Sequence, residues 1–346
     1  MKRFALGLLL SLTIICQASQ SYLTSSPHFT GTIGVQTNVN ARFGNQLLTY
    51  IKAQWAAEKY NLPYLHEPFD YDDQIFAGSA HPSLEQYKKS HPSVKIQTII
   101  DLEKLGTIDT RQPVIYQVKF NTKLNGNNFY DLHELEEMRN NKPFIKKMRR
   151  LLSPVTPIDI VQIPEKMKSI ALHVRNGGGY DLPLWSLPYF DEDILEAERA
   201  KTYDYSEIAD KYLDHARPLK APPEQYYLDQ INKILELYPN EDFYIHIFTD
   251  DPDPAGLIER LQTKISPTSQ QIIFNARHCG NRHDANVLED LLSMMQFDIL
   301  VRPSSSYSIF SHVLGNHELV IFPKKYEWIG RCLVYTDVKY ETVERD

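Results

Sequence analysis

Cysteine is scarce in this sequence, and its scarcity excludes a disulfide-stabilised scaffold. Only three of the 346 residues are cysteine, too few for the dense bridges that hold small secreted domains together. Cys16 falls in an N-terminal apolar run, so Cys279 and Cys332 can form one bridge at most or stay as buried thiols. The chain must therefore be stabilised by apolar cores, and its length predicts roughly two domains.

The sequence also lacks a block of positive charge. It has 37 Lys and Arg against 44 Asp and Glu, a net charge of −7. Nucleic-acid binding depends on clustered Lys and Arg that neutralise phosphates. The composition therefore argues against nucleic acid as a partner.

Long apolar runs are confined to the N-terminus. Lys2 and Arg3 precede the run Phe4–Cys16, and small residues follow at Ala18 and Ser19. This order predicts a signal peptide over residues 1–18. The run is shorter than the roughly 20 residues of a spanning helix, so a short signal anchor is the alternative. We expect a protein of the secretory pathway or another extracytoplasmic space, with no stable membrane span after the leader is removed.

The pattern of apolar residues after the leader predicts an α/β protein of two domains, residues 28–165 and 166–346. The first contains an amphipathic helix over 44–60. In the second, strands at 169–174, 242–250, 270–274, 298–303 and 318–322 alternate with helices at 222–238, 254–262, 284–297 and 305–315. Such alternation is typical of parallel βαβ units in a doubly wound sheet.

Polar segments follow four of these predicted strands. They are residues 173–179, 249–251, 277–280 and 302–306. Ligands of an open parallel sheet bind outside the carboxyl ends of its strands. We therefore expect the four segments to converge on one crevice.

The first segment pairs a cation with a permissive backbone. His173 and Arg175 end the strand, and Gly177–Gly179 follow. Arginine suits bidentate phosphate contact, and glycines allow close approach of the chain. The segment is neither a Walker A motif nor a G-x-G-x-x-G fingerprint. The alternative is a loop whose arginine pairs with a surface carboxylate.

The last segment places Ser304, Ser305 and Ser306 at the start of a helix. Hydroxyls and free N–H groups at the positive end of a helix dipole form an anion site. Simple N-capping is the alternative, although it needs only one serine.

Acidic residues end the 242–250 strand. They could hold Mg²⁺ or Mn²⁺ beside a nucleotide diphosphate, accept hydrogen bonds from a ribose or base, or cap the helix that starts at Pro254; these residues are Asp250, Asp251 and Asp253. Residues 277–284 contain three side chains of the kinds that bind zinc, His278, Cys279 and His283. A closed structural zinc site needs four ligands, so the sequence favours a polar loop that leads to an Asp284 helix cap.

Four of these stretches together resemble the α-1,2-fucosyltransferases, with shared motifs in the α-1,6- and protein O-fucosyltransferases. They are FGNQLLTYIKAQWAAEKYNLPYL, HVRNGGGYD, FTDD and LEDLLSMMQFDILVRPSSSYSIFSHVLGN, in the family's order. Two departures stand out. The family's usual Arg-Arg is Arg175-Asn176 here, and Phe43-Gly44 stands where a Gly-Gly pair is usual.

The resemblance implies a GT-B architecture of two Rossmann-like halves and an inverting transfer. The implied donor is GDP-fucose with no obligatory cofactor or metal, and the acceptor is a glycan or protein hydroxyl. By motif position, Arg175 would contact the β-phosphate and His173 the nucleotide. The other implied donor-binding residues are Asp250 or Asp251 and Asp290 at the guanosine, Ser304, Ser305 and Ser306 at the phosphates, and Gly44, Asn45 and Gln46 closing from the N-terminal half.

Inversion needs a carboxylate that deprotonates the acceptor hydroxyl, while Arg175 and the serine-rich helix stabilise the departing diphosphate. Asp181, just past the glycine loop, is the first candidate base, followed by Asp191 and Glu192. One alternative function is a metal-dependent glycosyltransferase that uses Asp250, Asp251 and Asp253. Another is a secreted, catalytically inactive glycan-binding protein on the same scaffold.

Overall fold

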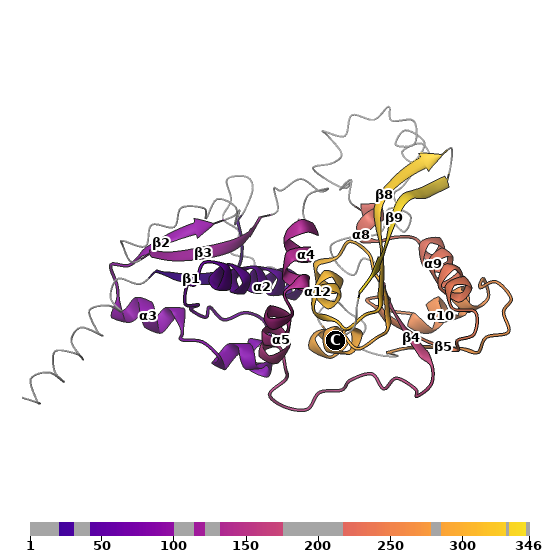
Figure 1. Ribbon diagram of the computed structural model, residues 1–346, viewed down its shortest axis with the longest axis horizontal. Coiled ribbons are helices and arrows are strands. Elements are labelled where there is room, and N and C mark those ends of the chain that lie inside the picture. The colour runs from indigo at the N-terminus through magenta and orange to yellow at the C-terminus, as the bar shows by residue number, and fades with distance from the viewer. Residues whose placement is uncertain are drawn as a thin grey trace, which may run out of the picture. The chain divides into compact units, whose positions relative to one another are not determined.

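The computed structural model describes residues 21–30, 42–99, 114–121, 132–175, 217–277, 285–329 and 332–343. The chain divides into two compact units, Met1–Pro157 and Ile158–Asp346 (Figure 1). The predicted signal peptide lies outside the described residues. Within the described ranges, no helix combines the length and the apolarity needed to cross a membrane.

The first unit is built on a three-stranded parallel sheet. Its strands are β1 (Tyr22–Thr30), β3 (Val114–Asn121) and β2 (Lys95–Ile99), in the order β1-β3-β2. Around it lie the helical segments α2 (Phe43–Lys59), η1 (Asp72–Gln74), η2 (Phe76–Ser79), α3 (Leu84–Ser90), α4 (Leu132–Asn140) and α5 (Lys142–Leu151).

Helix α2 confirms the helix predicted for residues 44–60, although it is buried on most of its surface and not on one face alone. Leu47, Leu48 and Ile51 are buried along one stripe. Trp55, on the same stripe, packs edge-on against Phe144 of α5, with ring centroids 5.0 Å apart. Helix α2 therefore forms because its apolar side chains can pack against elements distant in the sequence.

The second unit is built on a six-stranded sheet in the order β6-β5-β4-β7-β8-β9. Its strands are β4 (Lys168–Val174), β5 (Phe243–Thr249), β6 (Ile272–Ala276), β7 (Ile299–Val301), β8 (Leu319–Ile329) and β9 (Cys332–Thr342), and only β9 pairs antiparallel. The helices are α8 (Arg217–Lys220), α9 (Glu224–Leu237), α10 (Pro254–Gln262), α11 (Val287–Met294) and α12 (Ser306–Leu314). The predicted α/β class and doubly wound parallel sheet are confirmed.

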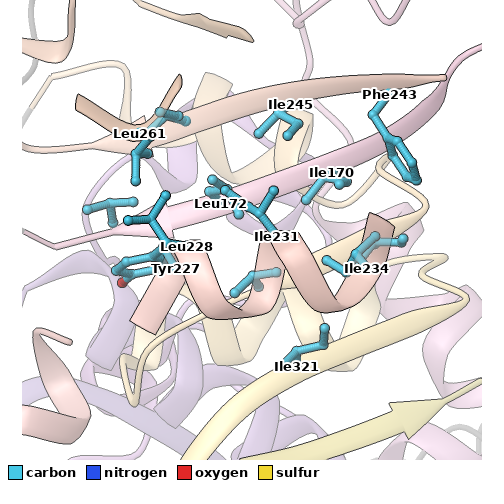
Figure 2. Close-up of a cluster of buried hydrophobic side chains, with 14 of the residues drawn as sticks. Ile170, Leu172, Tyr227, Leu228, Ile231, Ile234, Phe243, Ile245, Leu261 and Ile321 are labelled. Carbon is cyan, nitrogen blue, oxygen red and sulfur yellow. The ribbon is translucent and has the colours of Figure 1, made fainter. Parts of the chain in front are cut away.

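Two apolar cores cover the two faces of this sheet, because successive residues of a strand point to opposite faces. On one face, Ile170 and Leu172 of β4 pack with Ile231 and Ile234 of α9 (Figure 2). On the other face, Ala171 of β4 belongs to a core completed by β5, β7, β8 and α11, with members that include Phe248, Leu300, Val320 and Met294.

The last two strands depart from the expected pattern. Strand β8 runs to Ile329, beyond the predicted end at 322, and β9 has no counterpart among the predicted strands. Pro323 breaks the apolar run in the sequence, but the chain accommodates it with register shifts next to Pro323 and Lys325. The two strands continue as one long antiparallel hairpin (Figure 1).

Residues 158–165 begin the second unit, whereas the sequence pattern predicts a first domain that extends to residue 165. Val161 and Ile163 pack against the core that contains Ala171, and the Val161 N–H donates to Ser293 Oγ at 3.0 Å. This packing explains why the division falls between Pro157 and Ile158.

The burial of α9 gives a direct test of the second core. Ile234→Ala should lower the free energy of unfolding by about 2–5 kcal/mol, because it removes a fully buried side chain and leaves a cavity. Leu237→Ala, on the same helix but half exposed, is the matched control and should change it by about 0.5 kcal/mol or less. Urea denaturation measures both, and equal losses would contradict the packing.

Candidate functional site

The strand order creates a topological switch point between β4 and β7. From β4 the chain adds β5 and β6 on one side, then returns to add β7 and β8 on the other. In open α/β sheets the ligand crevice lies outside the carboxyl ends of the strands at this point. His173 and Arg175 are at the end of β4, and Ser304–Ser306 follow β7. The structure therefore places two of the four predicted polar segments at the switch point.

Tyr307, in the first turn of α12, connects these strand ends. Its ring lies 5.6 Å from the His173 ring, centroid to centroid. Its hydroxyl donates to the backbone oxygen of Val287, where α11 begins, at 2.5 Å. One half-buried side chain thus links the end of β4 to the N-terminal turns of α11 and α12.

His173 is held as a neutral imidazole. Burial, with the positive charges of Arg175 and Arg302, lowers its pKa to about 3. Its backbone oxygen accepts a hydrogen bond from the Tyr227 hydroxyl at 2.9 Å. Its Nδ1 is buried without a hydrogen-bond partner, and such a group is destabilising unless a partner arrives. His173 can therefore form a hydrogen bond with a ligand through Nδ1, but it supplies no positive charge.

The serines at α12 are not used as conventional caps. Ser305 is the N-cap residue, yet its hydroxyl makes no capping hydrogen bond. Ser305 and Ser306 are buried, and the Ser304 N–H donates to the Leu219 oxygen at 2.7 Å. The capping alternative for Ser305 is therefore wrong, and the helix terminus keeps the features of an anion site.

The acidic segment after β5 is largely occupied by local bonds. Asp253 Oδ1 accepts from the Gly256 N–H at 2.9 Å and caps α10. Asp251 Oδ1 accepts from the Asp253 N–H at 2.8 Å, and its own N–H donates to Thr249 Oγ1 at 3.1 Å. These bonds favour the capping interpretation of Asp253 and engage Asp251 in the turn before the helix, which argues against a cation site. Within the described ranges, no group of three or more His, Cys, Asp or Glu side chains is arranged to hold a metal.

Asp250 occupies a different position from its neighbours. Strand register pairs Val174 with Thr249, so Arg175 and Asp250 leave the sheet side by side at its carboxyl edge. Asp250 is half-buried there. It is the acid of this segment that the sheet brings closest to the switch point.

Asp290, in the first turn of α11, is bonded to Arg277 Nε. Arg277 also donates to the Asp159 carboxylate and backbone oxygen at 2.7 and 2.8 Å. Burial raises the pKa of Asp290 to about 6, against the opposing effect of Arg277. The bonds of Arg277 to Asp290 and Asp159 thus hold the first residues of the second unit to α11. The predicted contact of Asp290 with guanosine stays a prediction.

In the first unit, the predicted donor-closing residues occupy the first turn of α2. The Gln46 side chain makes two hydrogen bonds to Asp70. Its Nε2 donates to Asp70 Oδ2 and its Oε1 accepts from the Asp70 N–H, both at 2.8 Å. Gln46 therefore fixes the loop at Asp70 to α2. Gly44 is buried and Asn45 is half-buried beside it. Their role toward a donor stays a prediction.

Several predicted functional residues lie outside the described residues: Asn176, Gly177–Gly179, Asp181, Asp191, Glu192, His278, Cys279, His283 and Asp284. Conversely, the sequence suggests no individual role for Tyr307 or the Arg302 side chain, and it predicts Tyr227 only as a core residue of the 222–238 helix. For Arg302 the available signal was a charged residue directly after an apolar strand, since a charged side chain is rarely buried without a partner.

Solved structures similar to this chain include the following three. An Arabidopsis thaliana FUT1 mutant in complex with GDP is 13% identical, with a TM-score of 0.47, over 90% of this chain and 72% of that chain. POFUT1 in complex with GDP-fucose is 12% identical, with a TM-score of 0.40, over 86% and 95%. NodZ alpha-1,6-fucosyltransferase soaked with GDP-fucose is 10% identical, with a TM-score of 0.41, over 93% and 99%. No protein-family model and no curated protein matches the sequence.

The raised pKa of Asp290 predicts a specific pH dependence of stability. Between about pH 4 and pH 6 the folded protein binds more protons at Asp290 than the unfolded chain does, so the free energy of unfolding falls as pH rises through this window. Asp290→Asn cannot titrate, although its amide oxygen can still accept from Arg277.

We therefore expect the stability of Asp290→Asn relative to the parent to increase by about 1–3 kcal/mol from pH 4 to pH 6.5, since one pKa unit corresponds to about 1.4 kcal/mol. Urea denaturation at closely spaced pH values measures the difference. A constant difference across the window would show that Arg277 keeps the Asp290 carboxylate ionised throughout.

Proposed function

We propose that this chain is an inverting glycosyltransferase. It transfers a sugar, fucose by its sequence motifs, from a GDP-sugar to a glycan or protein hydroxyl. The observation that carries the proposal is the pairing, at one switch point, of Arg175 after β4 with the serine-rich N-terminus of α12 after β7. Both features recognise phosphate, one by a planar cation and the other by hydroxyls and a helix dipole.

The chemistry of transfer suits this arrangement. When a nucleoside diphosphate leaves, the sugar gains oxocarbenium character and negative charge grows on the phosphate. Arg175 and the N-terminus of α12 are placed to stabilise that charge in a partly buried site, where electrostatic interactions are stronger than in water. No cofactor and no obligatory metal take part.

Recognition of the nucleoside falls to acids in this proposal. Asp250, beside Arg175 at the carboxyl edge, accepts hydrogen bonds from the ribose or the guanine. Asp251 braces the same turn. Asp290 accepts from guanosine if the donor shares it with Arg277. By motif position, Asn45 is a further donor-binding residue.

The remaining parts follow from sequence. Asp181 acts as the base that deprotonates the acceptor hydroxyl, with Asp191 and Glu192 next in line. The leader at residues 1–18 directs the protein to the secretory pathway or another extracytoplasmic space.

A nucleotide panel tests the donor. At one hundred times its dissociation constant a ligand adds about 2.7 kcal/mol to the stability of the native state. For a unit of this size we expect GDP and GDP-fucose to raise the melting temperature by about 5–10 °C. UDP and CMP should raise it less. A shift with UDP but not with GDP would contradict a GDP-sugar donor.

Arg175→Lys serves as the control within the same panel. Lysine keeps the charge but loses the fork that matches phosphate, so the GDP contact should weaken by about 1.5–3 kcal/mol. If Arg175 only paired with a surface carboxylate, the GDP shift would be the same in the variant and in the parent.

A second measurement separates the acids. Asp181→Asn should leave GDP affinity unchanged but reduce GDP release from GDP-fucose, measured with an acceptor glycan mixture, by about 10²-fold or more. Asp250→Asn should instead weaken GDP binding. Full turnover in Asp181→Asn would pass the role to Asp191 or Glu192. No turnover in the parent, despite GDP binding, would favour the inactive glycan-binding alternative.

A further inference from the structure

A buried guanidinium lies next to the candidate phosphate site. Register pairs Leu172 of β4 with Val301 of β7, so His173 and Arg302 follow at neighbouring positions on the carboxyl edge. The Arg302 N–H donates to the Ile321 oxygen at 3.0 Å, which keeps the residue in the sheet. Its side chain is only 2% exposed. An arginine is thus buried at the switch point itself.

The Arg302 guanidinium belongs to a series of side-chain contacts beneath α12. Arg302 Nε and Nη2 lie 3.3 and 3.0 Å from His312 Nδ1, and Nη1 donates to the Pro303 oxygen at 3.1 Å. The guanidinium carbon lies 4.2 Å from the centre of the Phe322 ring. Because Nδ1 accepts, the His312 proton sits on Nε2, which lies 3.4 Å from Glu341 Oε2. The end of β7, helix α12 and strand β9 are joined by this chain of contacts.

Burying Arg302 carries a desolvation cost. A guanidinium cannot release its proton in a protein, so burial does not neutralise it. An apolar side chain of similar volume would avoid that cost. The cost is offset by negative charge within range of the guanidinium. Glu341 supplies one such charge through His312, and a diphosphate bound at the carboxyl edge would supply a second.

We propose that Arg302 is the second cation of the diphosphate site and acts as a positioning residue from beneath α12. The β4 loop begins with a single cation, because Asn176 follows Arg175. Only Pro303 and Ser304 separate Arg302 from the N-cap of α12. Its guanidinium bonds to His312 in the last turn of α12, while its backbone lies beside His173 at the carboxyl edge, so its positive charge lies beneath the helix and makes that edge more electropositive before a ligand arrives. The identity of the ligand rests on the proposed function.

His173 already senses this charge. Arg302 is one of the three causes of the lowered pKa of His173, after burial and Arg175. His173 also contacts Tyr307 in the first turn of α12. The charge of Arg302 thus affects His173 when no ligand is bound. The pKa of His173 therefore reports on Arg302 independently of the donor.

The test uses Arg302→Met and Arg302→Lys in the full chain. Calorimetry measures the affinities for GDP, inorganic pyrophosphate and guanosine. Arg302→Met should weaken GDP and pyrophosphate by about tenfold or more, because the lost interaction acts through a medium of low dielectric constant, and should change guanosine by about twofold or less. Arg302→Lys loses the fork to His312 and the planar stacking on Phe322 but keeps the charge, and should retain most of the diphosphate affinity.

The alternative is a purely structural Arg302, and it gives different results. Equal losses for guanosine and diphosphates in Arg302→Met, or the same losses in Arg302→Lys as in Arg302→Met, would overturn the proposal. So would an unchanged diphosphate affinity in folded Arg302→Met. If Arg302→Met does not fold, Glu341→Gln takes its place: removing the opposing charge should tighten pyrophosphate about two- to fivefold, and unchanged or weaker binding overturns the proposal.

Failure of the proposed function is distinguishable from failure of this inference. A parent protein that binds no nucleoside diphosphate would refute the donor, but the titration of His173 followed by NMR would still test whether the charge of Arg302 acts at the carboxyl edge. The pKa of His173 should be higher in Arg302→Met and unchanged in Arg302→Lys. An unchanged pKa in folded Arg302→Met would show that the field does not reach the site.

Discussion

The pairing of β4 with β7 is the constraint on which the candidate site depends. Three register pairs join the strands, from Ile170 with Ile299 to Leu172 with Val301. Their side chains are fully buried in two different cores, so a slip of one residue would move each side chain to the opposite face and disrupt the packing of both cores. The same register fixes His173 beside Arg302 and starts α12 at the edge where Arg175 leaves the sheet. The positions of the groups proposed to bind phosphate thus follow from the packing of apolar residues.

The two edges of the sheet treat their polar groups differently. At the amino edge, Asp298 Oδ2 accepts from both the N–H and the hydroxyl of Ser169, at 2.7 and 2.8 Å, and Lys168 pairs with Glu318. These groups satisfy one another and stabilise the fold. At the carboxyl edge, His173 Nδ1 has no partner and the Ser305 hydroxyl does not cap its helix. Unused hydrogen-bonding capacity at that edge is what a ligand can use.

Much of this arrangement could be predicted from sequence, because local patterns determine it. Periodicity places α2 and β4, and the rule for parallel sheets places Arg175 and Ser304–Ser306 at one edge. The capping bonds of Asp253 span three residues, so sequence could offer that alternative. Sequence could not choose between capping and metal binding, since the same acids serve both.

Contacts between distant residues were beyond such reasoning. Arg302 meets His312 ten residues away and, through it, Glu341 on a strand that sequence did not predict. Strand β9 carries little apolar signal because it lies at the edge of the sheet, where exposed polar positions are common. The Asp290 partner, Arg277, is near in sequence, but only the fold adds Asp159 to the pair. Where tertiary packing determines which two residues interact, a sequence motif can identify one residue of the interacting pair at most.

The charges at the switch point have a consequence for how the site depends on pH. Its cations are arginines, which stay protonated over the whole accessible range, whereas His173 is kept neutral down to about pH 3. A site that relied on a histidine of ordinary pKa would lose its positive charge near neutrality. Here the positive charge of the two arginines is constant from mildly acidic to alkaline conditions. A pH dependence of the proposed donor binding above pH 4 is therefore expected from groups other than these cations, such as Asp290 or the phosphates of the donor itself.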